Sequence, residues 1–198
     1  MRFTLLAACL LIGASTATAQ QPAQKPSLKT KFMTNMNASV GGSDDCNSAV
    51  AISGAGTFNF DNSAATTGAD GQNEYICYDF GSSAVDNDIW FAWTADADGQ
   101  ALVTLCGGTS MDSKLAISDG ACGALNVLAC NDDTCGLQSE VSAIVTNGST
   151  YYIQVGNFPG AAGGTGDLSI AITPILPPHP NDDCATTTGV LVEGANAI

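Results

Sequence analysis

The sequence predicts an all-β fold, an antiparallel β-sandwich or jelly roll, and three observations support it. Apolar residues alternate with Thr, Ser or Gln at a period of two, which is typical of half-buried strands. Turn-forming residues separate these runs. No segment places apolar residues at helical spacing over two turns. About eight to ten short strands over some 130 residues fit two stacked antiparallel sheets.

The alternating runs give the expected strands in chain order. Their inward faces hold Ala101, Val103 and Leu105; Val141, Ala143 and Val145; Tyr151, Ile153 and Val155; and Leu168, Ile170 and Ile172. Asn147-Gly148 is expected to form a tight hairpin turn between two of the longest strands. The predicted core consists of Ile52, Phe58, Ile89, Phe91, Trp93, Val103, Leu115, Ile117, Val127, Val141, Val145, Ile153, Val155 and Ile170.

The first 19 residues have the pattern of a secretory signal peptide. A basic start precedes an apolar run over 3–12, and small residues end the segment at Ala19. The run is about ten residues long, too short to span a bilayer. An alternative is a lipoprotein box that would leave a lipidated Cys9, but Cys9 lies inside the apolar run rather than at its end. We expect a soluble protein that is secreted or displayed at the cell surface.

The rest of the chain divides by composition. Residues 20–43 are rich in Gln, Pro, Lys, Asn and Ser and are expected to form a flexible leader. The predicted sandwich covers 44–173, and 174–180 form a Pro-rich linker. Because the pattern Asp-Asp-Cys at Cys46 recurs at Cys184, residues 181–198 are predicted to begin a truncated second repeat.

The cysteines predict a disulfide-stapled domain. Removing Cys9 with the signal peptide leaves seven of the eight cysteines, and Cys184 lacks a partner if its repeat is cut short. Zinc ligation is disfavoured because no Cys-x-x-Cys pair exists and exported proteins favour disulfides. Six cysteines allow fifteen pairings. The preferred set is Cys46–Cys77, Cys106–Cys135 and Cys122–Cys130, the last two expected to nest around neighbouring strands.

Composition excludes several classes of function. Five basic residues against nineteen acidic ones, a net charge of −14, argue against nucleic acid or an anionic membrane as a partner. The single histidine, His179, lies in the Pro-rich linker, where no scaffold would hold it for catalysis. Paired carboxylates for glycoside hydrolysis are available, but nothing singles out a pair. This chain is therefore predicted not to be an enzyme.

Four segments, in family order over residues 44–172, resemble the bacterial pre-peptidase C-terminal (PPC) domain. Asp88–Ala95 resembles its Asp-Val-Trp-Phe strand and Ser110–Leu115 its Phe-Asp-Thr-x-Leu strand start, with Met111 and Ser113 as departures. Cys130–Asp133 matches its Asn-Asp-Asp loop, and Tyr151–Gly156 its Tyr-Tyr-Ile-x-Val strand. The cysteines resemble those of a Cys-rich subgroup found in repeats on exported proteins. The resemblance implies a non-catalytic β-sandwich, and some relatives bind calcium and a polymeric substrate.

Two sets of residues are candidate binding sites. Carboxylates are the ligands that calcium prefers, and the alternative is that they cap turns or keep the surface soluble. Exposed aromatic rings could stack on a sugar or a collagen-like polymer, but Trp90 could instead pack under a loop or against the second sheet. The calcium candidates are Asp44, Asp45, Asp86, Asp88, Asp112, Asp132 and Asp133, and the stacking candidates are Trp90, Tyr152, Tyr75 and Tyr78.

The combined interpretation is a secreted, non-catalytic binding or structural module of a larger exported or cell-surface protein. Its expected partners are an extracellular polysaccharide or protein polymer, or neighbouring repeats of the same chain, and calcium is the one candidate cofactor. The alternative is the N-terminal accessory part of a secreted hydrolase, such as a peptidase, whose catalytic domain lies beyond Ile198.

Overall fold

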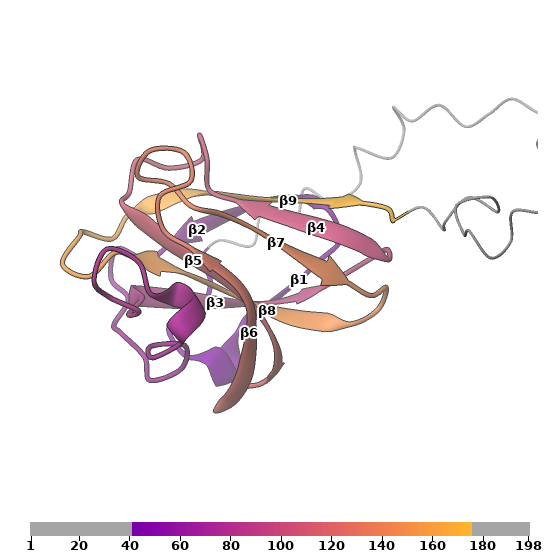
Figure 1. The fold of residues 1–198 in the computed structure, drawn as a ribbon, viewed down its shortest axis with the longest axis horizontal. Helices are drawn as coiled ribbons and strands as arrows, with labels where there is room; N and C mark the ends of the chain where they lie inside the picture. The colour runs from indigo at the N-terminus through magenta and orange to yellow at the C-terminus, as the bar shows by residue number, and fades with distance from the viewer. Residues whose placement is uncertain (1–40, 176–198) are drawn as a thin grey trace, which may run out of the picture. The chain divides into compact units, whose positions relative to one another are not determined.

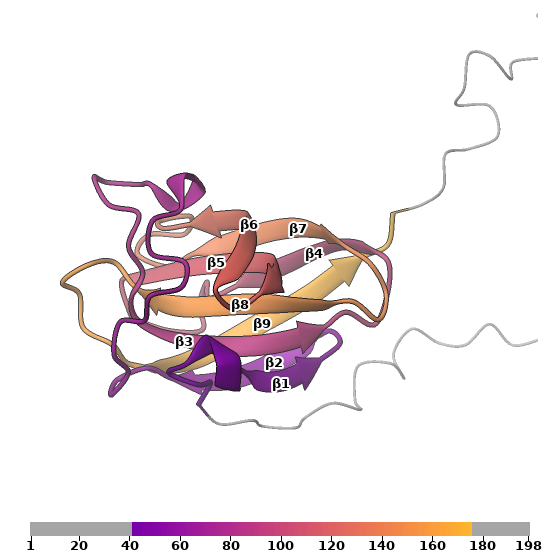
Figure 2. The same cartoon turned by 90° about the horizontal axis from the view of Figure 1, so that it is seen from below.

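The computed structural model describes residues 41–175, which fold into two packed β-sheets. The five-stranded sheet has the order β1-β3-β8-β5-β6 and the four-stranded sheet the order β2-β9-β4-β7, and the two lie as layers in Figures 1 and 2. The strands are β1 (Val50–Ser53), β2 (Gly56–Asp61), β3 (Asp86–Thr94), β4 (Gly99–Thr104), β5 (Ser113–Ala121), β6 (Ala124–Asn131), β7 (Glu140–Val145), β8 (Thr150–Asn157) and β9 (Thr165–Thr173), with two short 3-10 helices, η2 (Cys46–Ser48) and η3 (Tyr75–Cys77).

The predicted β-sandwich is confirmed, with one pair of strands running differently from the expectation. All neighbouring strands are antiparallel except β1 and β3, which pair in parallel from Val50 opposite Phe91 to Ser53 opposite Thr94. The chain leaves β1, crosses to the other sheet as β2, and returns as β3. Such a return places two strands of one sheet side by side in the same direction.

Apolar side chains from both sheets form one core between the layers. The alternation seen in the sequence reappears as burial, since β4 and β7 alternate buried and more exposed residues along their lengths. Every predicted core residue is buried in this cluster except Val127, which is half-buried because it pairs with Ser118 on the face of the sheet turned away from the core.

The predicted hairpin at Asn147-Gly148 is wrong, although the turn itself exists. The strands before and after it, β7 and β8, belong to different sheets, so the turn carries the chain across the core. Ser149 N–H closes the turn on the Thr146 carbonyl (3.0 Å), while Asn147 N–H donates to the Asp98 carboxylate (2.9 Å) and Gly148 N–H to the Ala95 carbonyl (2.8 Å). The two strands face each other with their apolar sides, which a two-residue hairpin within one sheet would not allow.

The structured domain starts slightly earlier than predicted. Gly41 bridges to Phe60, and Ser43 pairs with Trp90 through two backbone hydrogen bonds of 3.2 and 2.8 Å. These residues fall at the end of the segment predicted as a flexible leader. The predicted signal peptide, the remainder of the leader, most of the linker with His179, and the predicted second repeat with Cys184 lie outside the described residues.

Three disulfides staple the domain, and one of them was predicted correctly. Cys106–Cys135 is confirmed, but Cys46 pairs with Cys122 and Cys77 with Cys130. The predicted Cys122–Cys130 bond is impossible here because β6 runs between the two residues. At about 3.3 Å per residue, that strand holds them more than about 20 Å apart. Cys122 instead faces η2, and Cys130 holds η3 against β6.

Within residues 41–175 no helix is long and apolar enough to cross a membrane.

Candidate functional site

The predicted stacking residue Trp90 is buried and does not belong to a surface platform. Its side chain is 1% exposed, and its indole N–H donates to the Asp88 carboxylate at 2.8 Å. It lies on the outer face of the five-stranded sheet, which is covered by the long loop of residues 62–85. Tyr152, on the same face, is half-buried. The alternative interpretation, that Trp90 packs under a loop, is the correct one.

Asp88 is the polar centre of this covered face, not a surface carboxylate. It is fully buried and accepts hydrogen bonds from Gly68 N–H (2.7 Å), Trp90 Nε1 (2.8 Å) and Gln154 Nε2 (2.9 Å). Gly71 lets the loop approach, because its φ is +71° and a Cβ there would overlap the Gln154 side chain. The covering loop is thus tied to β3 and β8 through Asp88.

Burial raises the pKa of Asp88 above its ordinary 3.8, and the three hydrogen bonds only partly oppose this. A carboxyl whose pKa is higher in the folded state binds its proton more tightly when folded. The stability it contributes therefore falls as pH rises from 3.8 through the folded pKa.

We expect the free energy of unfolding of the wild type, relative to Asp88→Asn, to decrease as pH rises through that window. Denaturation of both proteins at a series of pH values measures this difference and cancels groups common to both. If the free energy of unfolding of the wild type rose with pH relative to that of Asp88→Asn, the raised pKa of Asp88 would be contradicted.

The remaining stacking candidates lie together on a loop that exposes four apolar side chains. Tyr75 is 90% exposed, Tyr78 60% and Phe80 68%, and Ile76 between them is 49% exposed. We call these four residues the aromatic loop. Burial of apolar area normally drives such side chains inward. Their exposure on one short segment makes that segment a candidate contact surface.

The aromatic loop is fixed in place by its backbone. Cys77 is buried and joined to Cys130 on β6, and Figure 2 shows η3 beside β6. Cys77 N–H donates to the Glu74 carbonyl at 2.9 Å, and Asp79 and Ser82 exchange two backbone hydrogen bonds. Held in this way, the rings are presented at a small cost in conformational entropy on binding.

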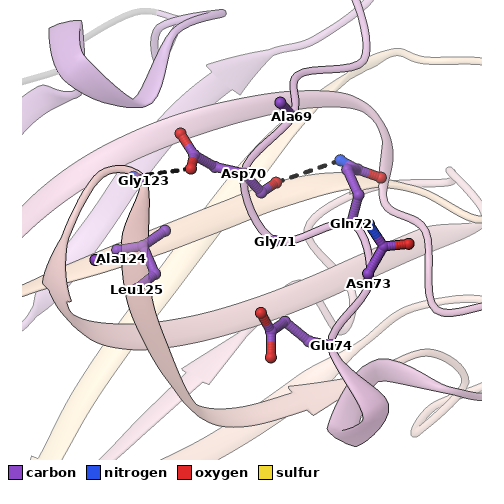
Figure 3. Close-up of a pocket in the computed structure, with 9 residues that line it drawn as sticks. All are labelled: Ala69, Asp70, Gly71, Gln72, Asn73, Glu74, Gly123, Ala124 and Leu125. Carbon is purple, nitrogen blue, oxygen red and sulfur yellow. Dashed lines mark hydrogen bonds between the residues drawn. The ribbon is translucent and has the colours of Figure 1, made fainter.

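A polar hollow of about 190 Å³ lies directly before the aromatic loop in the chain. Figure 3 shows it between the segment 69–74 and residues 123–125, at the β5–β6 turn and the start of β6, with the Gln72, Asn73 and Glu74 side chains around it. Asp70 fixes the two walls together by accepting a hydrogen bond from Gly123 N–H at 2.9 Å. Amide and carboxylate groups of this kind can bind hydroxyl groups.

Four of the seven calcium candidates belong to no group of three or more potential metal ligands within residues 41–175. Asp44 accepts hydrogen bonds from Thr66 N–H (2.6 Å) and its hydroxyl (2.8 Å), and Asp45 caps η2 by accepting from Asn47 N–H at 2.9 Å. Asp86 is half-buried at the start of β3, and Asp88 is engaged as described. Asp45 thus caps a local turn, which was the alternative interpretation, while Asp44 ties the start of the domain to the loop at Thr66.

The other three candidates meet at one end of the five-stranded sheet. Asp112, Asp132 and Asp133 each place a carboxylate oxygen within 4.8 Å of the others. Asp132 is 1% exposed, and neither of its oxygens has a hydrogen-bond partner among the described residues. Burial raises its pKa to about 6, with Asp133 and Asp112 adding to the rise and Lys114 opposing it. This group of oxygens fits a cation, and calcium binding here stays a prediction.

Sequence reasoning missed Lys114, which lies beside these carboxylates. Its Nζ is 3.7 Å from Asp132 Oδ2, and the side chain is fully buried. The signal was present, since Lys114 is the one Lys or Arg between residues 41 and 175 and directly precedes the apolar residues Leu115, Ala116 and Ile117. A buried cation in such an acidic domain indicates a specific anionic partner.

A comparison with solved structures finds the pre-peptidase C-terminal domain of a collagenase from Bacillus anthracis. The two share 12% sequence identity with a TM-score of 0.39, over 69% of this chain and 99% of that one. A scan against models of protein families finds no match, and no curated protein matches the chain. The fold assignment therefore depends on the strand pairing described above, and the Cys-rich subgroup and the repeats stay predictions.

Proposed function

We propose that this chain is an exported, non-catalytic binding module whose aromatic loop and adjoining polar hollow bind a neutral extracellular polysaccharide. The observation that carries the proposal is the exposure of Tyr75, Tyr78 and Phe80 on a loop fixed by the Cys77–Cys130 disulfide. The three disulfides also fit an oxidising compartment, in line with the expected signal peptide.

Sugar recognition follows from the two kinds of surface that adjoin here. The faces of pyranose rings are lined by C–H groups, which pack on exposed aromatic rings, while their hydroxyls need hydrogen-bonding groups at the side. The aromatic loop supplies the rings, and Gln72, Asn73 and Glu74 supply the polar groups. A net charge of −14 repels anionic polymers and so favours a neutral one.

A binding module of this kind would act within a larger exported or cell-surface protein. Contacts through two or three rings are individually weak, and repetition of the domain along a chain would strengthen attachment by raising the effective concentration. The same activity would serve an adhesin or an accessory domain that holds a hydrolase at its substrate.

Replacing Tyr75 or Tyr78 with alanine is expected to weaken binding about five- to tenfold, because each loses one stacked ring worth about 1 kcal/mol. The full chain is sedimented with insoluble cellulose, chitin and xylan, in calcium and in chelator, with anionic alginate gel beads as the negative control. Comparing binding in calcium with binding in chelator shows whether a cation at Asp112, Asp132 and Asp133 affects binding by the aromatic loop.

Two controls make this experiment specific. Tyr75→Phe keeps the ring and should bind nearly as wild type, and Ile144→Ala removes a side chain that is 63% exposed on β7, away from the loop. The proposal fails if none of the neutral polymers retains the wild type, or if Ile144→Ala weakens binding as much as Tyr75→Ala does.

A further inference from the structure

Lys114 and Asp132 are buried against each other at the end of the five-stranded sheet. Leu115 on β5 pairs with Asn131 at the end of β6, so Lys114 and Asp132 stand opposite each other one position further on. Their side chains are 0% and 1% exposed, and Lys114 Nζ lies 3.7 Å from Asp132 Oδ2. The carboxyl carbon Cγ is one bond away from Oδ2, so the amine nitrogen and the carbon of the carboxyl group belong to the same buried contact.

The two partners are held unequally. Lys114 Nζ donates to the Ser82 carbonyl at 2.8 Å and lies 5.6 Å from the centre of the Phe158 ring. Both Asp132 oxygens are buried without any hydrogen-bond partner among the described residues. An ionised carboxylate in that state is costly, and a buried pair is normally compensated by further hydrogen bonds to each member. A noncovalent ion pair with Lys114 does not explain why both Asp132 oxygens are buried without hydrogen bonds.

We propose that Lys114 Nζ and Asp132 Cγ become joined by an isopeptide bond, formed within the folded domain with the release of one water. This inference does not depend on the proposed polysaccharide binding, and it is an alternative to calcium at Asp132, because the amide has lost the carboxylate charge. It accounts for the unpartnered carboxylate, because the product is an uncharged amide in place of two buried charges.

The reaction balances without any further reactant. Proton transfer from the ammonium to the carboxylate first gives a neutral amine and a carboxylic acid. The nitrogen lone pair adds to the carboxyl carbon, a C–N bond forms, and one C–O bond breaks. The departing hydroxyl takes a proton that the nitrogen gives up and leaves as water. Asp112, with a carboxylate oxygen within 4.8 Å of one of Asp132, is near enough to relay that proton through one bridging water.

The link would join the start of β5 to the chain just beyond β6. This end of the sheet also carries the Cys77–Cys130 disulfide, which ties the aromatic loop to the same strand. A covalent bond that reduction cannot break would keep β5 and β6 together when the disulfides are opened.

Trypsin gives a direct test, because Lys114 is the single Lys or Arg after residue 31. The full chain, secreted by a bacterial host, is denatured, reduced, alkylated and digested. With the link, trypsin cannot cut at Lys114, and the chain after Lys31 is recovered as one fragment whose mass is lower by one water. Without the link, trypsin cuts there and gives two fragments of unaltered mass.

Two variants sharpen the test. Lys114→Arg keeps the positive charge and the tryptic site but cannot form the amide, so it should give two fragments. Asp132→Asn should still form the link by losing ammonia, and its fragment should have the same mass as that of the wild type. Two fragments of unaltered mass from the wild type would overturn the proposal. It would also be overturned if trypsin cut at Lys114 and one of the two separate fragments alone had lost a water.

Discussion

Replacing Cys46 and Cys122 together with alanine is expected to lower the free energy of unfolding by about 4 kcal/mol, because this disulfide closes a long loop in the unfolded chain. The two residues are 76 positions apart, and the bond joins η2 to the turn between β5 and β6. Urea denaturation of the full chain, compared with the wild type under non-reducing conditions, measures the loss.

The Cys106–Cys135 pair provides the matched control. It spans 29 positions, and its removal should cost about 1 kcal/mol less than removal of Cys46–Cys122. If the double variant at Cys46 and Cys122 left stability unchanged, or if mapping of the wild type joined Cys46 to Cys77, the pairing described here would be wrong.

Replacing Trp93 with alanine is expected to cost about 3–5 kcal/mol, which is the usual penalty for emptying a large core site. Trp93 is fully buried, its ring centre lies 5.9 Å from that of Tyr151, and its indole N–H donates to the Gly54 carbonyl at 2.9 Å. The alanine variant loses this packing and leaves the Gly54 carbonyl without its donor. Thermal and urea denaturation measure the change.

Trp93→Phe separates the two contributions. It keeps most of the packing and loses the hydrogen bond, so its cost should be clearly smaller, at about 1–2 kcal/mol. A cost below about 1 kcal/mol for Trp93→Ala would show that the two sheets do not pack on this side chain.

The strands and the core could be predicted from the sequence because each depends on a local pattern. Alternation along β4 and β7 places Val103 and Val141 on the inward face whatever the neighbouring strands are. The order of strands depends on contacts between distant residues, which alternation does not encode. For that reason the parallel pairing of β1 with β3 and the crossing at Asn147-Gly148 differ from the expectation.

Trp90 shows the same limit at the candidate site. Alternation correctly places Trp90 on the other face of the strand from Phe91. Whether that face is exposed depends on the loop of residues 62–85, which has no periodic pattern. The signal that could have revealed the covering was Asp88, two residues away on the same face. An acidic residue in an apolar strand suggests a buried hydrogen-bonding partner, and here Trp90 is that partner.

The sequence indicated that the acidic residues and the tyrosines were candidate site residues, but it did not show which of them lie together in space. Asp132 and Lys114 are 18 residues apart, and only the antiparallel register of β5 and β6 brings them together. Tyr75 and Tyr78 are exposed because Cys77 between them turns inward to Cys130, a pairing that the sequence left open.

The central claim, that residues 69–80 with the β5–β6 turn form the polysaccharide-binding surface, is tested most directly by nuclear magnetic resonance. Soluble oligosaccharide fragments of cellulose, chitin and xylan are titrated into the isotopically labelled full chain, and the backbone amide signals are followed. The account predicts that the fragments of at least one polymer shift the signals of residues 69–80 and 122–125. Shifts concentrated on the four-stranded sheet, or none at the aromatic loop with any fragment, would contradict it.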